Sequence, residues 1–168
     1  MKYMETGGFQ NKPLMRLTLA WTLVFAAGLW ATNAAMYFQR MSLFPSSVEA
    51  YYLGSAEEYS QPRSAASLLE VSHAHLATMG VMILLLTHLA IFAPWDDRTK
   101  KWIIGLGFGS SFVGEASGWL VRFVSPGFAV LKVACFVAFQ SILGLLIAVL
   151  AIFLYRSAPA HKKRSIRS

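Results

Sequence analysis

Apolar residues along this chain fall into four long stretches that are separated by short polar segments. A bilayer core about 30 Å thick takes about 20 helical residues to cross, and each stretch reaches that length. Continuous apolar runs lack the period-two alternation of a membrane barrel, and open strands would leave backbone groups unpaired in lipid. The pattern therefore predicts an all-α fold, a single membrane domain over residues 1–168 built as a bundle of four transmembrane helices. The predicted helices cover residues 17–38, 67–93, 102–123 and 128–155, and Pro94 ends the second.

Composition supports a membrane protein, and the distribution of charge predicts its orientation. Of 168 residues, 56% are hydrophobic and only 14% are charged, whereas soluble domains carry about 25% charged residues. Basic residues are in excess in the N-terminal tail, in the connection at 95–101 and in the tail at 156–168, whereas the loop at 40–66 is balanced. Cytoplasmic loops carry the excess of Lys and Arg, so both termini are predicted to be cytoplasmic in a bacterial inner membrane. The net charge of +7 is interpreted as topology and contact with anionic lipid, and no nucleic acid is expected as a partner.

The loop at 40–66 is the largest segment expected outside the bilayer. Ser46 and Glu49 have the spacing of a capping box, which predicts a short helix over residues 48–53 that Gly54 ends. Two interpretations stay open, a helix lying on the outer membrane surface and a lid over an outward-facing site.

Polar residues inside apolar helices are costly and are therefore the candidates for chemistry. Counting from the helix ends places most of them in the outer leaflet, with His88 toward the cytoplasm. One interpretation is a buried polar network that fixes the register of the helices. The residues assigned to that network are His75, Arg122, Lys132 and Gln140, with Glu115 as a further member.

Two histidines of the second stretch suggest a haem site. His73 and His88 are fifteen residues apart, so they fall within about 60° of one helix face and about 22 Å apart. This arrangement, with Gly80 between them, resembles the haem-bearing helix of membrane cytochromes b and implies haem b. The second axial ligand would come from a symmetry mate in a homodimer or from Met36. The alternative is that these histidines only hydrogen-bond neighbouring helices.

A metal site and a proton-handling site are further alternatives. Glu70 and His73 form an E-x-x-H step on one helix face, as in carboxylate-bridged metal proteins, and Glu115 would complete a mononuclear site. Glu115 beside Arg122 or His73 would instead titrate differently from a free carboxylate.

The third stretch contains two GxxxG steps, which allow helices to approach closely. Gly105 and Gly109 form one step, and Gly114 and Gly118 form the other. The nearest glycines of the two steps, Gly109 and Gly114, differ in phase by about 140°, so each step is expected to face a different neighbour.

Several strings resemble a loosely defined group of small bacterial four-helix membrane proteins. They are YYLGSAEEY from Tyr51, LLEVSHAHL from Leu68, THL from Thr87 and GWLVRFVSPGFAVL from Gly118. The resemblance covers residues 49–131 and implies a four-helix envelope protein, with His73, His75, Arg122 and Pro126 in the pattern of the group. It implies an architecture and no reaction.

The leading functional hypothesis is a non-enzymatic membrane subunit of a larger envelope complex, in one form binding haem b and transferring electrons. A chain of 18.6 kDa with little mass outside the bilayer has no room for a separate catalytic domain. One alternative is a structural or assembly protein without a cofactor. The other is a small ion- or proton-coupled transporter that uses Glu115, Lys132 and the histidines as a relay.

Overall fold

The structure is a computed structural model that describes residues 13–57 and 59–156. The predicted all-α class is confirmed, because the described residues form helices and no strand apart from one isolated bridge between Ser55 and Ser60. The predicted basic tail beyond Arg156 lies outside the described residues. The elements in chain order are α1 (Pro13–Arg40), α2 (Pro45–Leu53), α3 (Ala65–Ala90), α4 (Asp97–Phe123), the 3-10 turn η2 (Pro126–Phe128) and α5 (Ala129–Arg156).

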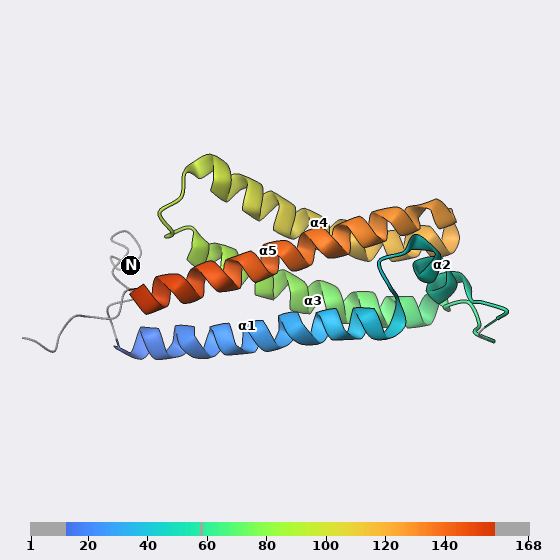
Figure 1. Cartoon of the computed structure of the whole chain (residues 1–168), viewed down its shortest axis with the longest axis horizontal. Coiled ribbons are helices and arrows are strands. Elements are labelled where there is room, and N and C mark those ends of the chain that lie inside the picture. The colour runs from blue at the N-terminus through green and yellow to red at the C-terminus, as the bar shows by residue number, and fades with distance from the viewer. Residues whose placement is uncertain (1–12, 58, 157–168) are drawn as a thin grey trace, which may run out of the picture.

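The four long helices lie side by side and alternate in direction along the chain (Figure 1). The start of α1 and the end of α5 lie at one end of the bundle, and α2 lies at the opposite end. Helix α5 packs against α1, α3 and α4, most extensively against α4. The bundle therefore has an end that carries the start of α1 and the end of α5, and an α2 end.

Three of the helices in the described part of the chain are long and apolar enough to cross a membrane. These candidate spans are Pro13–Arg40, Ala65–Ala90 and Pro126–Tyr155. Helix α4 is 27 residues long, but its Gly, Ser and charged residues make it less apolar than these three candidate spans. The chain is thus a multi-pass membrane protein with at least these three apolar helices.

Capping residues define where two of the long helices begin. The Ser64 hydroxyl accepts a hydrogen bond from Ser67 N at the start of α3. The Asp96 carboxylate accepts one from Thr99 N at the start of α4. Both satisfy a backbone N–H that has no partner within its helix. The second predicted helix ends early, because α3 stops at Ala90 and the chain turns before Pro94.

The predicted capping box of the short helix is wrong. Helix α2 begins at Pro45, its N-cap residue is Phe44, and no side chain caps it. Proline favours the first helical position because its φ is fixed there and its missing N–H is not needed, so Ser46 falls inside the helix. Gly54 ends α2 as predicted, with φ of 82°, where an added Cβ would lie 2.6 Å from the Ser60 carbonyl oxygen.

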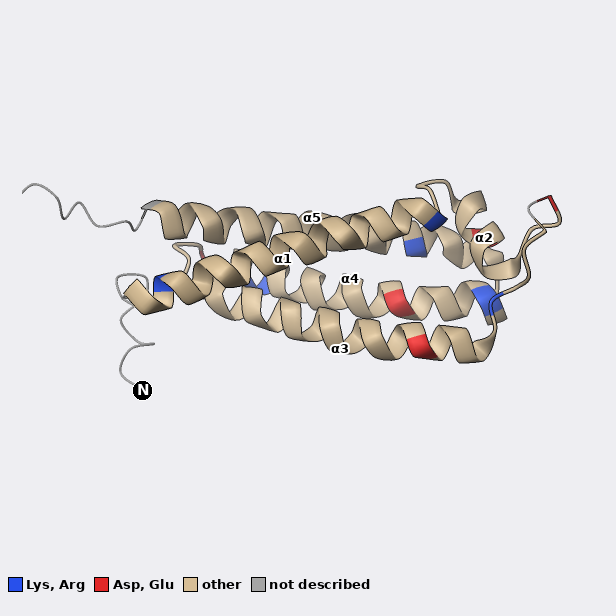
Figure 2. Ribbon diagram, turned by 90° about the horizontal axis from the view of Figure 1, so that it is seen from below, with Lys and Arg blue, Asp and Glu red and all other residues tan. Residues whose placement is uncertain are grey.

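Two hydrophobic cores hold the bundle together. The larger core joins all four long helices and includes Leu23, Ile83, Ile103 and Leu146. The smaller core lies at the α2 end. There Val48 and Tyr52 of α2 are buried together with residues of α3, α4 and α5: Leu68, Val121 and Ala129. Helix α2 is therefore docked on the bundle, and several of the charged residues of the long helices lie toward this end (Figure 2).

Candidate functional site

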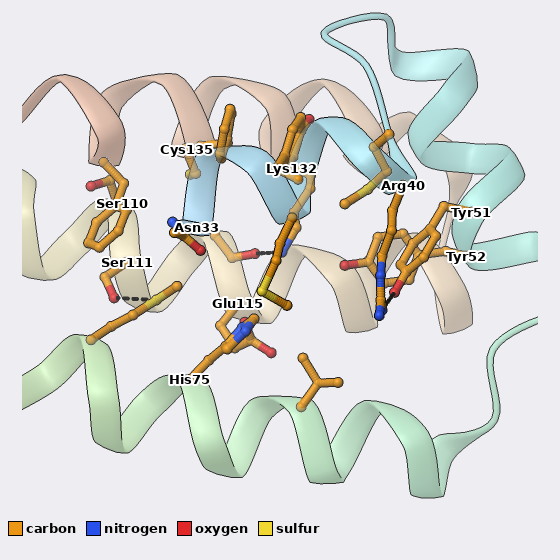
Figure 3. A pocket seen from close by; sticks show the side chains of 18 residues that line it. Asn33, Arg40, Tyr51, Tyr52, His75, Ser110, Ser111, Glu115, Lys132 and Cys135 are labelled. Atoms are coloured by element: carbon orange, nitrogen blue, oxygen red, sulfur yellow. Dashed lines mark hydrogen bonds and ion pairs between the residues drawn. The ribbon is translucent and has the colours of Figure 1, made fainter. Parts of the chain in front are cut away.

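A cavity of about 210 Å³ lies inside the α2 half of the bundle. All five α-helices contribute to its wall, and apolar side chains such as Phe136 and Phe139 line much of it. Figure 3 shows the polar side chains, which come from different elements and gather around one space. The main polar lining residues are Asn33, Arg40, Tyr51, His75, Glu115 and Lys132.

Glu115 of α4 is the centre of a hydrogen-bonded group with two residues of α3. Its Oε1 accepts a hydrogen bond from the Ser72 hydroxyl at 2.6 Å, and its Oε2 lies 3.1 Å from His75 Nδ1. Trp119 donates its indole N–H to the Ser72 oxygen at 2.8 Å. The Glu115 side chain is only 12% exposed, against 36% for His75. A carboxylate so enclosed needs these donors, because burying an unpaired charge is costly.

Lys132 brings a positive charge to the same cavity from α5. Its Nζ donates a hydrogen bond to the Gly114 carbonyl oxygen at 2.7 Å, next to Glu115 in the chain. Gly114 permits this approach, since an added Cβ there would lie 3.2 Å from Cys135 Cβ. The close packing of α4 on α5 thus holds the ammonium of Lys132 and the carboxylate of Glu115 on one cavity wall.

Aromatic and arginine side chains lie at the α2 end of the cavity. Arg40, the last residue of α1, donates a hydrogen bond to the Tyr51 hydroxyl at 3.0 Å, and the Arg63 guanidinium lies 4.3 Å from the centre of the Tyr51 ring. Tyr52 packs against Gly118. Burial of the Tyr52 hydroxyl raises its pKa, and the nearby negative charge of Glu115 raises it further.

The structure brings together only part of the predicted polar network. His75, Glu115 and Lys132 line the cavity. Arg122 donates to the Arg63 carbonyl oxygen at 2.8 Å and ties α4 to the segment before α3. Gln140 is not among the cavity-lining residues.

Gln140 instead lies where α5 contacts α1. Trp30 donates its indole N–H to the Gln140 carbonyl oxygen at 3.0 Å. Gly144 leaves room for this ring, which is 3.4 Å from where a Cβ would lie. This contact fixes α1 against α5.

The residues predicted for haem and metal binding do not form one site within the described chain. His73, His88 and Glu70 are exposed on α3, whereas Met36 lines the cavity together with His75. His73 and His75 are about 200° apart around the helix, and the packing of α3 turns His75 inward. An added Cβ at Gly80 would have open space around it. Among the described residues, no group of three or more His, Cys, Asp or Glu side chains is placed to hold a metal ion, so Glu70 and His73 do not join Glu115.

Sequence reasoning missed several residues of the site. Ser72 and Trp119 belong to the Glu115 group, and Arg40 and Asn33 line the cavity. Ser72 lies three residues before His75 and therefore shares its helix face, a spacing that is visible in the sequence. The contribution of α1 and α2 to the cavity depends on how these helices pack, for which the sequence offers no comparable signal.

The two GxxxG steps of α4 have different surroundings. Added Cβ atoms would meet Cys135 at Gly114 and Tyr52 at Gly118, whereas Gly105 and Gly109 have nothing within 4 Å. The step at Gly114 and Gly118 is therefore the one that packs within the bundle.

The fold and the cavity define a multi-pass α-helical membrane protein. The chain belongs to the Aq_1264_TM family, a transmembrane helical domain, which it matches over residues 42–163. The match begins after α1, so α1 lies outside the matched part although it forms one wall of the cavity. No match is found among curated proteins or among solved structures.

Proposed function

We propose that this protein is a non-enzymatic membrane protein that binds a small anionic ligand in the cavity at the α2 end. One observation carries this proposal: two basic side chains, the partly buried Lys132 and the exposed Arg40, line a largely apolar cavity. Glu115, the one carboxylate among the described lining residues, is already hydrogen-bonded. With both basic groups protonated, Lys132 and Arg40 exceed the single Glu115 carboxylate by one positive charge. Lys132 is partly withdrawn from water, and a cation in surroundings of lower dielectric attracts an anion more strongly than it would in water.

Hydrogen-bonding capacity also favours an anionic or oxygen-rich ligand. A lysine ammonium has three donors, and among the described residues Lys132 gives one hydrogen bond, to the Gly114 carbonyl. The guanidinium of Arg40 has five donors and gives one, to Tyr51. Donors thus outnumber the acceptors that the cavity wall supplies to them.

Three described serines in or beside the cavity are engaged in hydrogen bonds within the bundle. Ser72 donates its hydroxyl to Glu115 and accepts from Trp119, and it is buried. Ser110 donates to a carbonyl of its own helix, and Ser111 donates to Met79.

The topology that we propose has four membrane spans, with both termini in the cytoplasm of a bacterial cell. The start of α1 and the end of α5 lie at the same end of the bundle, as an even number of crossings requires (Figure 1). Helix α4 is proposed as the fourth span, with its charged residues at 97–101 at the membrane surface. Its glycines Gly114 and Gly118 pack against α5 and α2. The α2 end then faces outward, and the protein acts as a small subunit of an envelope complex to which it presents the bound ligand.

Binding of butyrate to the purified protein in lipid nanodiscs tests the proposal. We expect millimolar butyrate to raise the unfolding temperature, because a ligand that binds only the folded state stabilises it. Lys132→Gln should remove this shift, and Lys132→Arg should retain part of it. Lys101→Gln, an exposed lysine of α4, is the matched control and should behave as the wild type. An equal shift in Lys132→Gln, or no shift in the wild type, would reject the proposal.

Haem binding stays a second candidate because His73 and His88 are exposed on the surface of α3, where a partner chain could supply the other axial ligand. The visible absorbance spectrum of the protein purified in mild detergent, oxidised and reduced, tests this candidate. A colourless preparation would reject it.

A further inference from the structure

One side of the cavity lies between α1 and α3, and these two helices pack against each other only loosely there. Helix α1 packs on α5, and α3 packs on α4 and α5, but α1 and α3 are not among the extensively packed pairs. Both helices nevertheless line the cavity (Figure 3), α1 through Asn33, Met36 and Arg40 and α3 through Val71, His75 and Met79.

The side chains of this wall face the cavity and the outside at the same time. Met36 lines the cavity and is 52% exposed, and Val71 lines it and is 36% exposed. Both belong to helices that are candidate membrane spans. We therefore infer that the exposed surfaces of Met36 and Val71 meet lipid, which makes the thinly packed side between α1 and α3 the candidate lateral opening of the cavity.

The interior and the opening differ in chemistry. Lys132 is a basic group inside the cavity and Arg40 is an exposed basic group at its α2 end, whereas Met36 and Val71 offer an exposed apolar surface between α1 and α3. Methionine side chains are flexible and adapt to varied apolar partners. A ligand that satisfies both parts has an anionic head and an apolar tail.

The size of the cavity limits the ligand further. Its volume of about 210 Å³ is smaller than the roughly 300–1,000 Å³ of pockets that enclose a drug-sized ligand. The cavity thus has room for a head group and the first part of a chain, while the rest of the chain extends through the opening into lipid. A single narrow chain suits this geometry better than the two chains of a bilayer phospholipid.

We propose that the ligand is an anionic single-chain amphiphile that enters from the outer leaflet between α1 and α3. Its acidic head group binds Lys132 and Arg40, and its chain lies against Met36 and Val71. This inference rests on the proposed anion site and adds the route and the class of ligand.

The experiment compares dodecanoate with butyrate, which carry the same carboxylate, on the whole protein in nanodiscs. We expect half-maximal thermal stabilisation by dodecanoate at a total concentration at least tenfold lower than by butyrate. Dodecanol should give no such effect, because it lacks the charge. Dodecyl phosphate, tested in parallel, shows whether a phosphate head group binds better than a carboxylate.

Bulky substitutions test the opening itself. Met36→Trp and, independently, Val71→Trp should reduce the ratio between butyrate and dodecanoate concentrations from at least tenfold to about one. Val81→Trp, on an exposed apolar part of α3 that does not line the cavity, is the matched control and should leave the ratio unchanged. The circular dichroism spectrum and unfolding temperature of each variant without ligand establish that it is folded.

The outcomes separate this inference from the proposed function. Binding of butyrate without any gain for dodecanoate would reject the lateral opening and leave the anion site intact. An unchanged ratio in both folded tryptophan variants, or an equal loss in Val81→Trp, would also overturn it. Failure of every acid to bind would reject the anion site and the inference together.

Discussion

At the residue scale, Gly118 decides how α2 is attached to the bundle. A Cβ at this position would lie 2.7 Å from the Tyr52 hydroxyl oxygen and 2.9 Å from its Cζ. Tyr52 is buried and belongs to the smaller hydrophobic core, so its ring has little room to move away. Glycine is required at position 118 because the two helices touch there.

Replacing Gly118 by alanine should therefore destabilise the protein. We expect a loss of about 1–3 kcal/mol in the free energy of unfolding, the usual cost of overpacking a core, measured by chemical unfolding in detergent. Gly105→Ala is the matched control, because nothing lies within 4 Å of a Cβ there. That change should be neutral or stabilise the helix by about 0.5–1 kcal/mol. Equal effects of the two changes would contradict the packing of Tyr52 on Gly118.

At the element scale, hydrogen bonds at the start of α4 define where this helix of the site begins. Helix α4 begins at a carboxylate cap, where Asp96 Oδ1 accepts from the Thr99 hydroxyl at 2.6 Å and Oδ2 accepts from Thr99 N at 3.1 Å. These hydrogen bonds, that of the hydroxyl first, lower the pKa of the Asp96 carboxyl. Because the pKa is lowered in the folded state, the cap contributes its full stability at pH values above the ordinary pKa of aspartate. This contribution is lost as the pH falls through the lowered pKa of Asp96.

Thr99→Val should raise the pKa of Asp96 toward its usual range, because the stronger of the two hydrogen bonds disappears. Carbon NMR of the Asp96 carboxyl, titrated in the wild type and in the variant, measures the change. Thr78→Val is the control, since the Thr78 hydroxyl donates to a carbonyl within α3 and leaves the cap intact. A pKa of Asp96 that does not respond to Thr99→Val would show that the hydroxyl has no part in the cap.

At the scale of the whole molecule, the antiparallel bundle places the cavity in its α2 half. The α1–α3 connection lies at the α2 end, and the α3–α4 connection lies at the end with the start of α1 (Figure 1). If α4 is a fourth span and basic residues stay in the cytoplasm, the cavity belongs to the outer leaflet.

Labelling of single cysteines in intact cells checks this orientation. Tyr59 is 93% exposed in the α1–α3 connection, and Asp97 is exposed at the start of α4. In a Cys135→Ala background, an impermeant maleimide should label Tyr59→Cys before permeabilisation and Asp97→Cys only after it. The reverse result would invert the orientation and place the cavity in the inner leaflet.

The sequence by itself determined the all-α class and the apolar stretches, because the transfer of side chains from water to lipid depends on local composition. It also determined that His73 and His75 face different sides of one helix, since the helical repeat is fixed. The Gly, Ser and charged residues of α4 lower its mean hydropathy. The sequence argument for a fourth span therefore depends on charge and length.

Only the tertiary structure decided which polar groups meet. Ser72 and His75 are 43 and 40 residues from Glu115 in the chain, and their contact depends on the rotation of α3 and α4 about their axes. That rotation is set by packing at glycines such as Gly114 and Gly118, where small changes in side-chain volume move whole helices. The docking of α2 and the contribution of α1 to the cavity follow from the same packing, which composition and periodicity do not specify.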